Sequence, residues 1–502
     1  MSAEWPLKTL SDFIKIKHGF AFKGEYFKNE ATDDLLVTPG NFAIGGGFKA
    51  DKFKYYDGPV AQDYILQKGD LVVTMTDLSK QADTLGYSAI IPYFLGKRLL
   101  HNQRVGLVDF KNNEIDKTYL YFLLRSKEYR NHVLGGVTGT TVKHTSPTKI
   151  LSYQFRKPAI EKQVEIGRQL IVLEKKIQLN RQINQTLESM AQAIFQSWFV
   201  DFDPVKAKIA AREQWQILTD DERTEWLNEL LDKQAFLKTC LSELTANGEQ
   251  NASETLYLNI TAMTAISSRN ETSLADMPAD EFSQLYKTAS LFPERLVESE
   301  LGEIPEGWEV RSLSHQIELI GGGTPKRSEE KFWNGDIPWF SVKDVPSDGN
   351  VFVIETEERI TEIGLKKSST KILKEGTTIV TARGTVGKLA LVGVDMCMNQ
   401  SCYGVVGNNT GPYFNYFNLQ GAVETLKRNT HGAVFDTITT KTFDTYKSSC
   451  GPTYISDEFE SLITPLMKNI KDNLFQISTL SNLRDSLLPK LLSGELEVQS
   501  NV

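Results

Sequence analysis

The chain has 502 residues, a length that predicts about three domains of ordinary size. Hydrophobic residues make up 40% of it and charged residues 24%, which is typical of a soluble globular protein. It holds no apolar run of about 18 residues that would predict a membrane span. The first residues lack the basic stretch and apolar core of a secretory signal, so we expect a cytoplasmic protein with reduced cysteines at positions 240, 397, 402 and 450.

The net charge of −8 is concentrated in one segment. Residues 205–302 hold nine Lys and Arg against 17 Asp and Glu, whereas residues 1–155 hold 20 against 16. Contact with DNA phosphates depends on where Lys and Arg are placed and not on the total charge. The distribution therefore permits DNA binding outside the central segment but does not predict it by itself.

An internal repeat organises the chain. The matches follow the same order in both copies: Trp5, residues 66–74, Asn102 and Gly139 in the first, and Trp308, residues 373–381, Asn399 and Gly432 in the second. From Gly139 and Gly432 onward the copies align at a constant offset of 293. Because several weak matches in one order are hard to obtain by chance, we predict a duplication.

The first part of each copy, residues 1–155 and 303–455, predicts a mixed α/β domain. Short apolar strands such as 71–74 and 378–381 are separated by Gly-rich turns and by short helices such as 117–124. The strands and framework glycines match between the copies, while the side chains at the loop tips differ. This is the pattern expected of one scaffold that recognises two different partners.

The second part of each copy, residues 156–204 and 456–502, predicts a long helix with a coiled-coil stripe. The stripe positions are Leu170, Leu173, Ile177, Asn180, Leu187 and Ile194 in the first helix, and Ile463, Leu466, Ile470, Asn473, Ile477, Leu480 and Leu487 in the second. Each helix has two possible partners, its own domain or the other helix. Equal length and shared register favour the second, so we predict two similar α/β domains separated by an antiparallel coiled coil with pseudo-two-fold symmetry.

Residues 205–302, between the copies, predict an acidic and partly helical connector. Thr219 and Glu222 form a capping-box pattern ahead of a helix. Residues 245–275 are rich in Ser, Thr and Asn, which predicts an exposed connecting segment.

The motifs of catalysis are missing from the sequence. Residues 384–389 resemble a phosphate-binding loop, but Ala382 and Leu389 stand where that loop needs Gly and Ser or Thr. The glycines at 321–323 lack the strand and helix of a dinucleotide site, and the six histidines are scattered. We therefore predict a protein without catalytic activity and without a metal site.

Several loops have the character of a DNA-binding surface. Free backbone amides, hydroxyls and cations can lie against a phosphate backbone, and an arginine at a strand end can reach a guanine edge. The predicted contact residues are Thr324, Lys326, Arg327, Ser341, Lys343 and Arg383 in the second domain, and Thr76, Lys80, Gln81 and Lys143 in the first.

Three stretches of the chain carry a family resemblance: residues 190–208, 291–308 and 487–496. With Gly322-Gly323-Thr324-Pro325 and the 383–387 loop, they resemble the specificity subunit of type I restriction–modification systems. The first domain departs from the family most, because it lacks the Gly-Gly-Thr-Pro turn. The resemblance implies that residues 1–155 and 303–455 are target-recognition domains, each of which recognises one half of a split target in double-stranded DNA.

The resemblance also implies partner subunits. Two modification subunits would bind the helices and methylate adenine with S-adenosylmethionine, and restriction subunits would add ATP- and Mg-dependent translocation and cleavage. The chain itself would hold no cofactor. Two alternatives stay open: a self-contained DNA methyltransferase or nuclease, and a scaffold whose two domains bind proteins.

Overall fold

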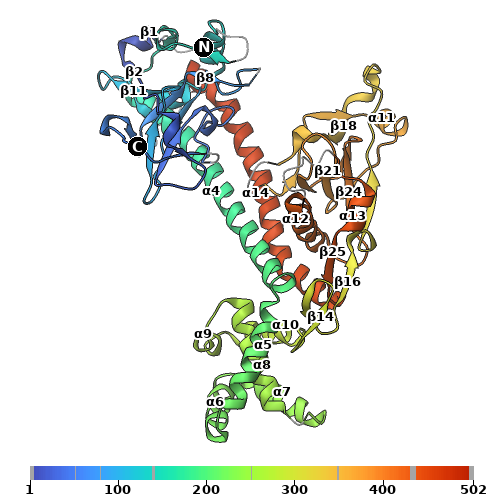
Figure 1. Cartoon of the computed structure of the whole chain (residues 1–502). Helices are drawn as coiled ribbons and strands as arrows, with labels where there is room; N and C mark the ends of the chain where they lie inside the picture. The colour runs from blue at the N-terminus through green and yellow to red at the C-terminus, as the bar shows by residue number, and fades with distance from the viewer. Residues whose placement is uncertain are drawn as a thin grey trace. The chain divides into compact units, whose positions relative to one another are not determined.

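The computed structural model describes residues 5–50, 53–79, 81–137, 142–249, 251–346, 350–429 and 437–496. The chain separates into two compact units, Met1–Gln178 with Ser478–Val502 (unit 1) and Leu179–Ile477 (unit 2). Each unit contains one α/β domain and one part of both long helices, α4 (Ile160–Phe199) and α14 (Thr453–Ser493) (Figure 1). Among the described residues, none of the helices combines the length and apolar character needed to cross a membrane.

The first domain, in unit 1, is built on two sheets. One has the strand order β2–β11–β7–β9, and the other has the order β3–β5–β4–β10–β6 with β4 and β10 parallel. The strands are β1 (Leu7–Thr9), β2 (Ile14–His18), β3 (Phe27–Lys28), β4 (Asp34–Val37), β5 (Lys54–Tyr56), β6 (Ile65–Leu66), β7 (Leu71–Thr74), β8 (Thr76–Asp77), β9 (Ser88–Ile90), β10 (Arg98–His101), β11 (Val105–Phe110), β12 (Lys143–His144) and β13 (Gln154–Arg156). The helices are α1 (Lys117–Leu123), α2 (Lys127–Leu134) and α3 (Pro147–Leu151).

The second domain, in unit 2, has the same construction. Its sheets have the orders β17–β24–β21–β22–β19 and β20–β18–β23, with β18 and β23 parallel. The strands are β14 (Leu296–Ser299), β15 (Gly302–Pro305), β16 (Glu309–Ser312), β17 (Ile317–Gly321), β18 (Trp333–Phe340), β19 (Phe352–Val353), β20 (Glu358–Ile360), β21 (Thr378–Thr381), β22 (Leu389–Val392), β23 (Cys397–Met398), β24 (Cys402–Gly407) and β25 (Lys447–Cys450). The helices are α11 (Glu362–Lys366), α12 (Pro412–Asn429) and α13 (Thr440–Thr445).

The duplication is visible in the strand pairing and in individual glycines. The order β2–β11–β7–β9 repeats as β17–β24–β21–β22, and the pair β1–β13 repeats as β16–β25. A Cβ added at Gly19 would overlap the carbonyl oxygen of Asn102, and one added at Gly322 would overlap that of Asn399. Both positions need glycine because two loops cross there at backbone distance. The predicted fold class of two similar α/β domains is confirmed.

The long helices belong to the core of both units. In unit 1, Leu170 of α4 and Leu491 of α14 are fully buried in one cluster with Tyr119 and Phe122 of the first domain. In unit 2, Trp198 of α4 and Phe459 of α14 share a buried aromatic cluster with residues of the second domain. The long helices therefore complete the hydrophobic core of each domain and do not serve as a flexible linker.

The two helices run antiparallel where they meet. In unit 2 the Asn473 amide donates to Asn184 Oδ1 over 2.9 Å, and the Asn180 amide donates to Gln476 Oε1 over 3.2 Å. In unit 1 the Arg484 guanidinium bonds Glu174 over 2.7 Å. Residue numbers rise along one helix as they fall along the other, which confirms the predicted antiparallel pair.

The buried positions differ in detail from the predicted stripe. Leu170, Ile177, Asn180, Ile463 and Ile470 are fully buried. Other stripe positions are only partly buried: Leu173, Leu187, Ile194, Leu466, Asn473, Ile477, Leu480 and Leu487. The neighbouring residues Glu174, Phe195, Met467 and Leu474 are buried in their place. Each helix packs on a domain as well as on its partner, so its buried face is wider than a two-position seam.

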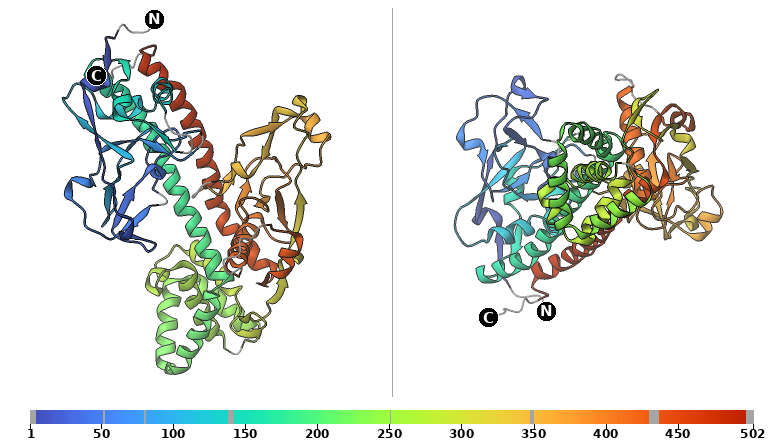
Figure 2. Two further views of the ribbon diagram at one scale, coloured as in Figure 1. Left: turned by 45° about the horizontal axis from the view of Figure 1, so that its top comes forward. Right: turned by 90° about the horizontal axis from the view of Figure 1, so that it is seen from below.

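Residues 203–290 of unit 2 form a helical bundle next to the C-terminal end of α4 (Figure 2). Its helices are α5 (Asp203–Ile217), α6 (Asp220–Lys233), α7 (Ala235–Ala246), α8 (Ala252–Ser267), α9 (Glu271–Ala275) and α10 (Ala279–Ser290). The predicted capping box is present: the Glu222 amide donates to Thr219 Oγ1 over 3.3 Å, and the Thr219 amide donates to Glu222 Oε2 over 2.8 Å.

The predicted exposed segment at residues 245–275 is wrong for α8. Leu256, Ile260 and Met263 of this helix are buried in the centre of the bundle. Three of its hydroxyl side chains, those of Thr261, Thr264 and Ser267, donate to backbone carbonyls of the same helix, as Thr261 Oγ1 does to Tyr257 over 3.0 Å. Such bonds let a Ser- and Thr-rich segment remain helical and enter a core, which composition alone does not reveal.

Candidate nucleic-acid interface

Three loops of the second domain are tied to a single turn, residues 398–401. The Gly323 amide donates to the Met398 carbonyl over 3.0 Å, the Asn399 amide donates to Phe340 over 2.9 Å, and the Arg383 amide donates to Ser401 over 3.2 Å. These bonds join the loops that follow β17, β18 and β21. The structure therefore brings the loops of Thr324, Ser341 and Arg383 to one edge of the domain.

The loop after β17 is held rigidly. A Cβ at Gly323 would overlap the Thr370 amide, and the Trp339 indole donates to the Gly323 carbonyl over 3.0 Å. Thr324 Oγ1 donates to the Gln400 side chain, which lies on the shared turn. Lys326 is exposed and forms an ion pair with Glu329 over 3.6 Å. The hydroxyl of Thr324 is thus fixed in place, while the ammonium group of Lys326 points into solvent.

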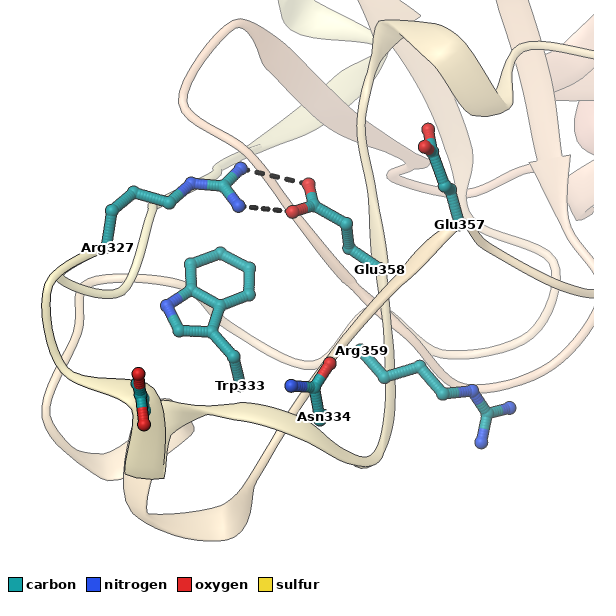
Figure 3. Close-up of a pocket in the computed structure, with 7 residues that line it drawn as sticks. Arg327, Trp333, Asn334, Glu357, Glu358 and Arg359 are labelled. Carbon is teal, nitrogen blue, oxygen red and sulfur yellow. Dashed lines mark hydrogen bonds and ion pairs between the residues drawn. The ribbon is translucent and has the colours of Figure 1, made fainter.

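Arg327 lies on an aromatic platform at the rim of a pocket (Figure 3). Its guanidinium carbon is 4.0 Å from the Trp333 ring centroid, and both of its terminal nitrogens bond the Glu358 carboxylate, Nη2 over 2.9 Å. The hydrogen bonds from Arg327 lower the pKa of Glu358 and hold it ionised. The cavity measures about 380 Å³ and is lined by Arg327, Glu330, Trp333, Asn334, Glu357, Glu358 and Arg359.

Ser341 and Lys343 have different surroundings. The Ser341 hydroxyl accepts from the Lys343 amide over 3.3 Å and donates to Asp344 over 3.0 Å, so it caps the short helical turn that follows β18. Lys343 is exposed and pairs with Glu357 over 3.2 Å. Ser341 therefore shapes the loop, whereas the Lys343 ammonium group faces solvent.

Arg383 begins a loop that is anchored by the buried Thr381. Thr381 Oγ1 donates to the Thr385 carbonyl and accepts from the Lys388 amide over 2.9 Å. Gly384 has a φ of 81°, which lets the chain turn sharply just after Arg383. The Arg383 side chain is exposed. Among the described residues it is the one predicted contact cation of this domain without a carboxylate partner.

The corresponding loop of the first domain has the same anchor but a longer course. Thr74 Oγ1 donates to the Thr84 carbonyl over 2.5 Å and accepts from the Gly86 amide over 2.9 Å. Burial raises the pKa of Asp77, but hydrogen bonds from Thr84 and Ser79 outweigh this, and the net pKa is lowered. The ionised Asp77 carboxylate thus holds the loop through these hydrogen bonds. The sequence alone shows only that the two copies differ at this position.

Thr76 and Lys143, two of the predicted contact residues of the first domain, lie on the paired strands β8 and β12. Thr76 is 4% exposed and bonds His144 Nδ1 over 3.1 Å. A buried hydroxyl with a partner is poorly placed to contact DNA, so Thr76 is set aside. Gln81 is exposed, Lys143 is partly buried in β12, and Lys80 lies outside the described residues.

The first domain has an aromatic surface that is not predicted from the sequence. Phe20 follows Gly19 at the place that Gly323 occupies after Gly322, and it is 41% exposed. Its ring centroid lies 5.1 Å from that of Tyr64, and the Lys17 ammonium group is 5.7 Å above the Tyr64 ring. The one signal that could have located this surface is the match of Asn102 to Asn399, because each contacts the glycine before the loop.

Comparison with known proteins identifies the family. The family profile described as the type I restriction modification DNA specificity domain matches residues 2–189 and 305–473, which is more than half of the chain. The chain belongs to this family. The matched ranges do not include residues 190–304, which hold the helical bundle, or residues 474–502.

Two sequence relatives agree with this assignment. The chain is 29% identical over 390 residues to the type I restriction enzyme HindI specificity subunit of Haemophilus influenzae, which covers 75% of this chain and 77% of the relative. It is 30% identical over 141 residues to the MjaIX specificity subunit of Methanocaldococcus jannaschii, 28% of this chain and 33% of that one. A crystal structure of a type I restriction–modification S subunit from M. genitalium aligns over 97% of this chain and 96% of its own, with 12% identity and a TM-score of 0.49.

Proposed function

We propose that this chain is the DNA-recognition subunit of a type I restriction–modification system, in which each α/β domain recognises one half of a split target. One observation carries the proposal: the two domains repeat the same strand pairing and loop anchors, yet differ in the side chains at the loop tips. A shared frame with different tips suits the recognition of two different half-sites.

In the second domain, anchored loops would place the few side chains that meet the DNA. Arg383 is exposed and leaves a loop fixed by Thr381, and an arginine can bond the O6 and N7 atoms of guanine with two hydrogen bonds. The ammonium groups of Lys326 and Lys343 suit phosphate contacts, which orient the protein without selecting a sequence. Arg383 is thus the proposed base-recognising residue, with the lysines as its supports.

We assign the spacing between the half-sites to the helix pair. Helix α4 has 40 residues and α14 has 41, which corresponds to roughly 60 Å each at 1.5 Å per residue. One turn of DNA is roughly 34–36 Å long, so such helices can hold two domains at least one turn apart. The polar layer of Asn180, Asn184, Asn473 and Gln476 supports this role, since polar groups at a helix seam fix its register.

Catalysis is assigned to partner subunits. Two modification subunits would bind along the helices, where Leu179, Ile183 and Met190 of α4 are 49%, 37% and 48% exposed. S-adenosylmethionine would be held by those subunits, and ATP and Mg²⁺ by the restriction subunits, with the whole complex in the cytoplasm. The absence of a phosphate-loop motif at residues 384–389 favours the assignment of catalysis to partner subunits.

The test is methylation mapping in cells that carry the chain with its modification subunits. We expect methylated adenines in a bipartite motif with a fixed unspecified gap. A single uninterrupted motif would contradict the two-domain proposal. Binding of S-adenosylmethionine by the isolated chain would favour a self-contained methyltransferase instead.

A further inference from the structure

The predicted contact cations of the second domain are mostly neutralised. Lys326 pairs with Glu329, Arg327 with Glu358, and Lys343 with Glu357. A surface that binds any DNA would leave such cations free, because phosphate contacts supply most of the non-specific affinity. The carboxylates of this edge therefore oppose the attraction that its cations provide.

Glu358 is the most firmly held of these carboxylates. Its side chain is 31% exposed, compared with 60% for that of Glu357. Its backbone carbonyl accepts a hydrogen bond from Thr356 Oγ1 over 2.7 Å, and Thr356 in turn accepts from the Trp339 amide over 3.1 Å. These bonds fix the backbone at Glu358, and its carboxylate lies at the rim of the pocket shown in Figure 3.

Arg327 is restrained from the opposite side. Its guanidinium stacks on Trp333 at 4.0 Å and lies 5.1 Å from the Trp339 ring centroid, while both terminal nitrogens face Glu358. A phosphate that approaches Arg327 must compete with this carboxylate for the same donors. It must also come close to a fixed negative charge, which disfavours binding.

We propose that Glu358 limits the sequence-independent binding of DNA by keeping Arg327 engaged. This rests on the proposed DNA-recognition function. The penalty applies to any phosphate backbone, whatever its sequence. Base-recognising groups such as Arg383 offset this penalty on the target, so the target stays bound at protein concentrations too low to hold non-target DNA.

A direct base contact by Glu358 is less favoured by the geometry. Both of its carboxylate oxygens already accept from Arg327. A cytosine amino group would have to displace the guanidinium from one of them. The experiment below separates this alternative from the proposed role.

The test compares the full-length chain with Glu358→Gln and with a matched control, Glu309→Gln. Glu309 pairs with Arg311 over 2.6 Å on β16, away from the loops tied to turn 398–401, and 66% of its side chain is exposed. Affinities are measured by fluorescence anisotropy for the mapped target and for a scrambled duplex, between about 50 and 200 mM salt. Thermal unfolding confirms that each variant is folded.

We expect Glu358→Gln to tighten binding to the scrambled duplex by about 3- to 10-fold, with a salt dependence steeper by about one counterion. Binding to the target should tighten by a similar factor, and Glu309→Gln should change neither. The gain should disappear in the double variant Arg327→Gln/Glu358→Gln, because no cation is then released.

Three results would overturn the proposal. They are an unchanged affinity for scrambled DNA, a gain that persists without Arg327, and a selective loss of target binding, which would make Glu358 a base contact. A different result would contradict the proposed function: equal affinities of the unmodified chain for the target and for scrambled DNA. The affinity for scrambled DNA decides the role of Glu358 in either case.

Discussion

Thr74 and Thr381 show how single side chains shape the interface. Each is fully buried at the end of a central strand, and each hydroxyl bonds two backbone groups in the later part of the following loop. The loop in the first domain is longer, yet the anchor is the same. Buried hydroxyls thus hold the loops of the proposed DNA-recognising edge in place. The exposed side chains at the loop tips determine its chemistry.

Arg383 is expected to distinguish sequences. Arg383→Ala should weaken binding to the target by roughly 1–3 kcal/mol and leave scrambled DNA almost unchanged, because a base contact is lost. Lys388→Ala, which removes an exposed cation from the same loop, serves as the control and should weaken both duplexes about equally. Equal losses for Arg383→Ala on both duplexes would mean that Arg383 contacts phosphate only.

Lys208 is expected to make stability depend on pH. It is 1% exposed, its ammonium group donates to the Phe292 carbonyl over 2.7 Å, and burial lowers its pKa to about 8. The folded chain therefore binds this proton less tightly than the unfolded chain, so the free energy of unfolding rises with pH between about 8 and 10.5.

This dependence is measured by denaturant unfolding at about pH 7.5 and 9.5. The rise should be larger by about 2 kcal/mol in the unmodified chain than in Lys208→Met, which cannot titrate. If both proteins showed the same pH dependence, Lys208 would not carry a shifted pKa in the folded state.

At the scale of elements, the two halves of the helix pair are built differently. In unit 1, Glu174 lies between Arg484 at 2.7 Å and Arg125 at 3.4 Å, and all three side chains are largely buried. By the offset of 293, the corresponding positions in unit 2 are Met467 and Ala191, which are buried and apolar. A duplicated helix pair has therefore acquired an ionic contact at one end and an apolar one at the other.

Glu174→Gln should destabilise unit 1 strongly. Removal of the carboxylate leaves the buried Arg125 guanidinium without its counter-charge and Arg484 with only the exposed Asp485, which costs about 3–5 kcal/mol. Hydrogen exchange should show faster opening of α1 and of the part of α4 in unit 1, with the helical bundle of unit 2 as an internal reference. Unchanged exchange in α1 would show that the ion network does not hold the first domain to the helices.

The elements also show what the sequence can predict. The 3-4 spacing predicts the long helices and their pairing, since a narrow apolar stripe has few other uses. It does not predict that Phe195 and Met467 are more buried than Ile194 and Leu466, because this depends on the domains packed outside the pair. At the candidate site, glycines and cations point to the loops of the second domain. Phe20 and Glu358 are missed, because an aromatic side chain or a carboxylate has no such signal without its neighbours.

For the whole molecule, we propose that the helix pair sets the gap between the two recognised half-sites. A shorter helix pair must therefore change the gap and nothing else. Residues 180–186 of α4 face residues 471–477 of α14, as the bonds Asn184–Asn473 and Asn180–Gln476 show. Deletion of both segments removes the four side chains of the polar layer together, and the Glu375 carboxylate, which loses Lys471, is half exposed.

Methylation mapping of this double deletion, alongside the unmodified chain, tests whether the helix pair sets the gap between the half-sites. Each helix loses seven residues, or roughly 10 Å, which corresponds to about 3 base pairs of DNA. We predict that both half-sites stay the same and that the gap between them shortens by about that amount. Altered half-sites with an unchanged gap would contradict the account.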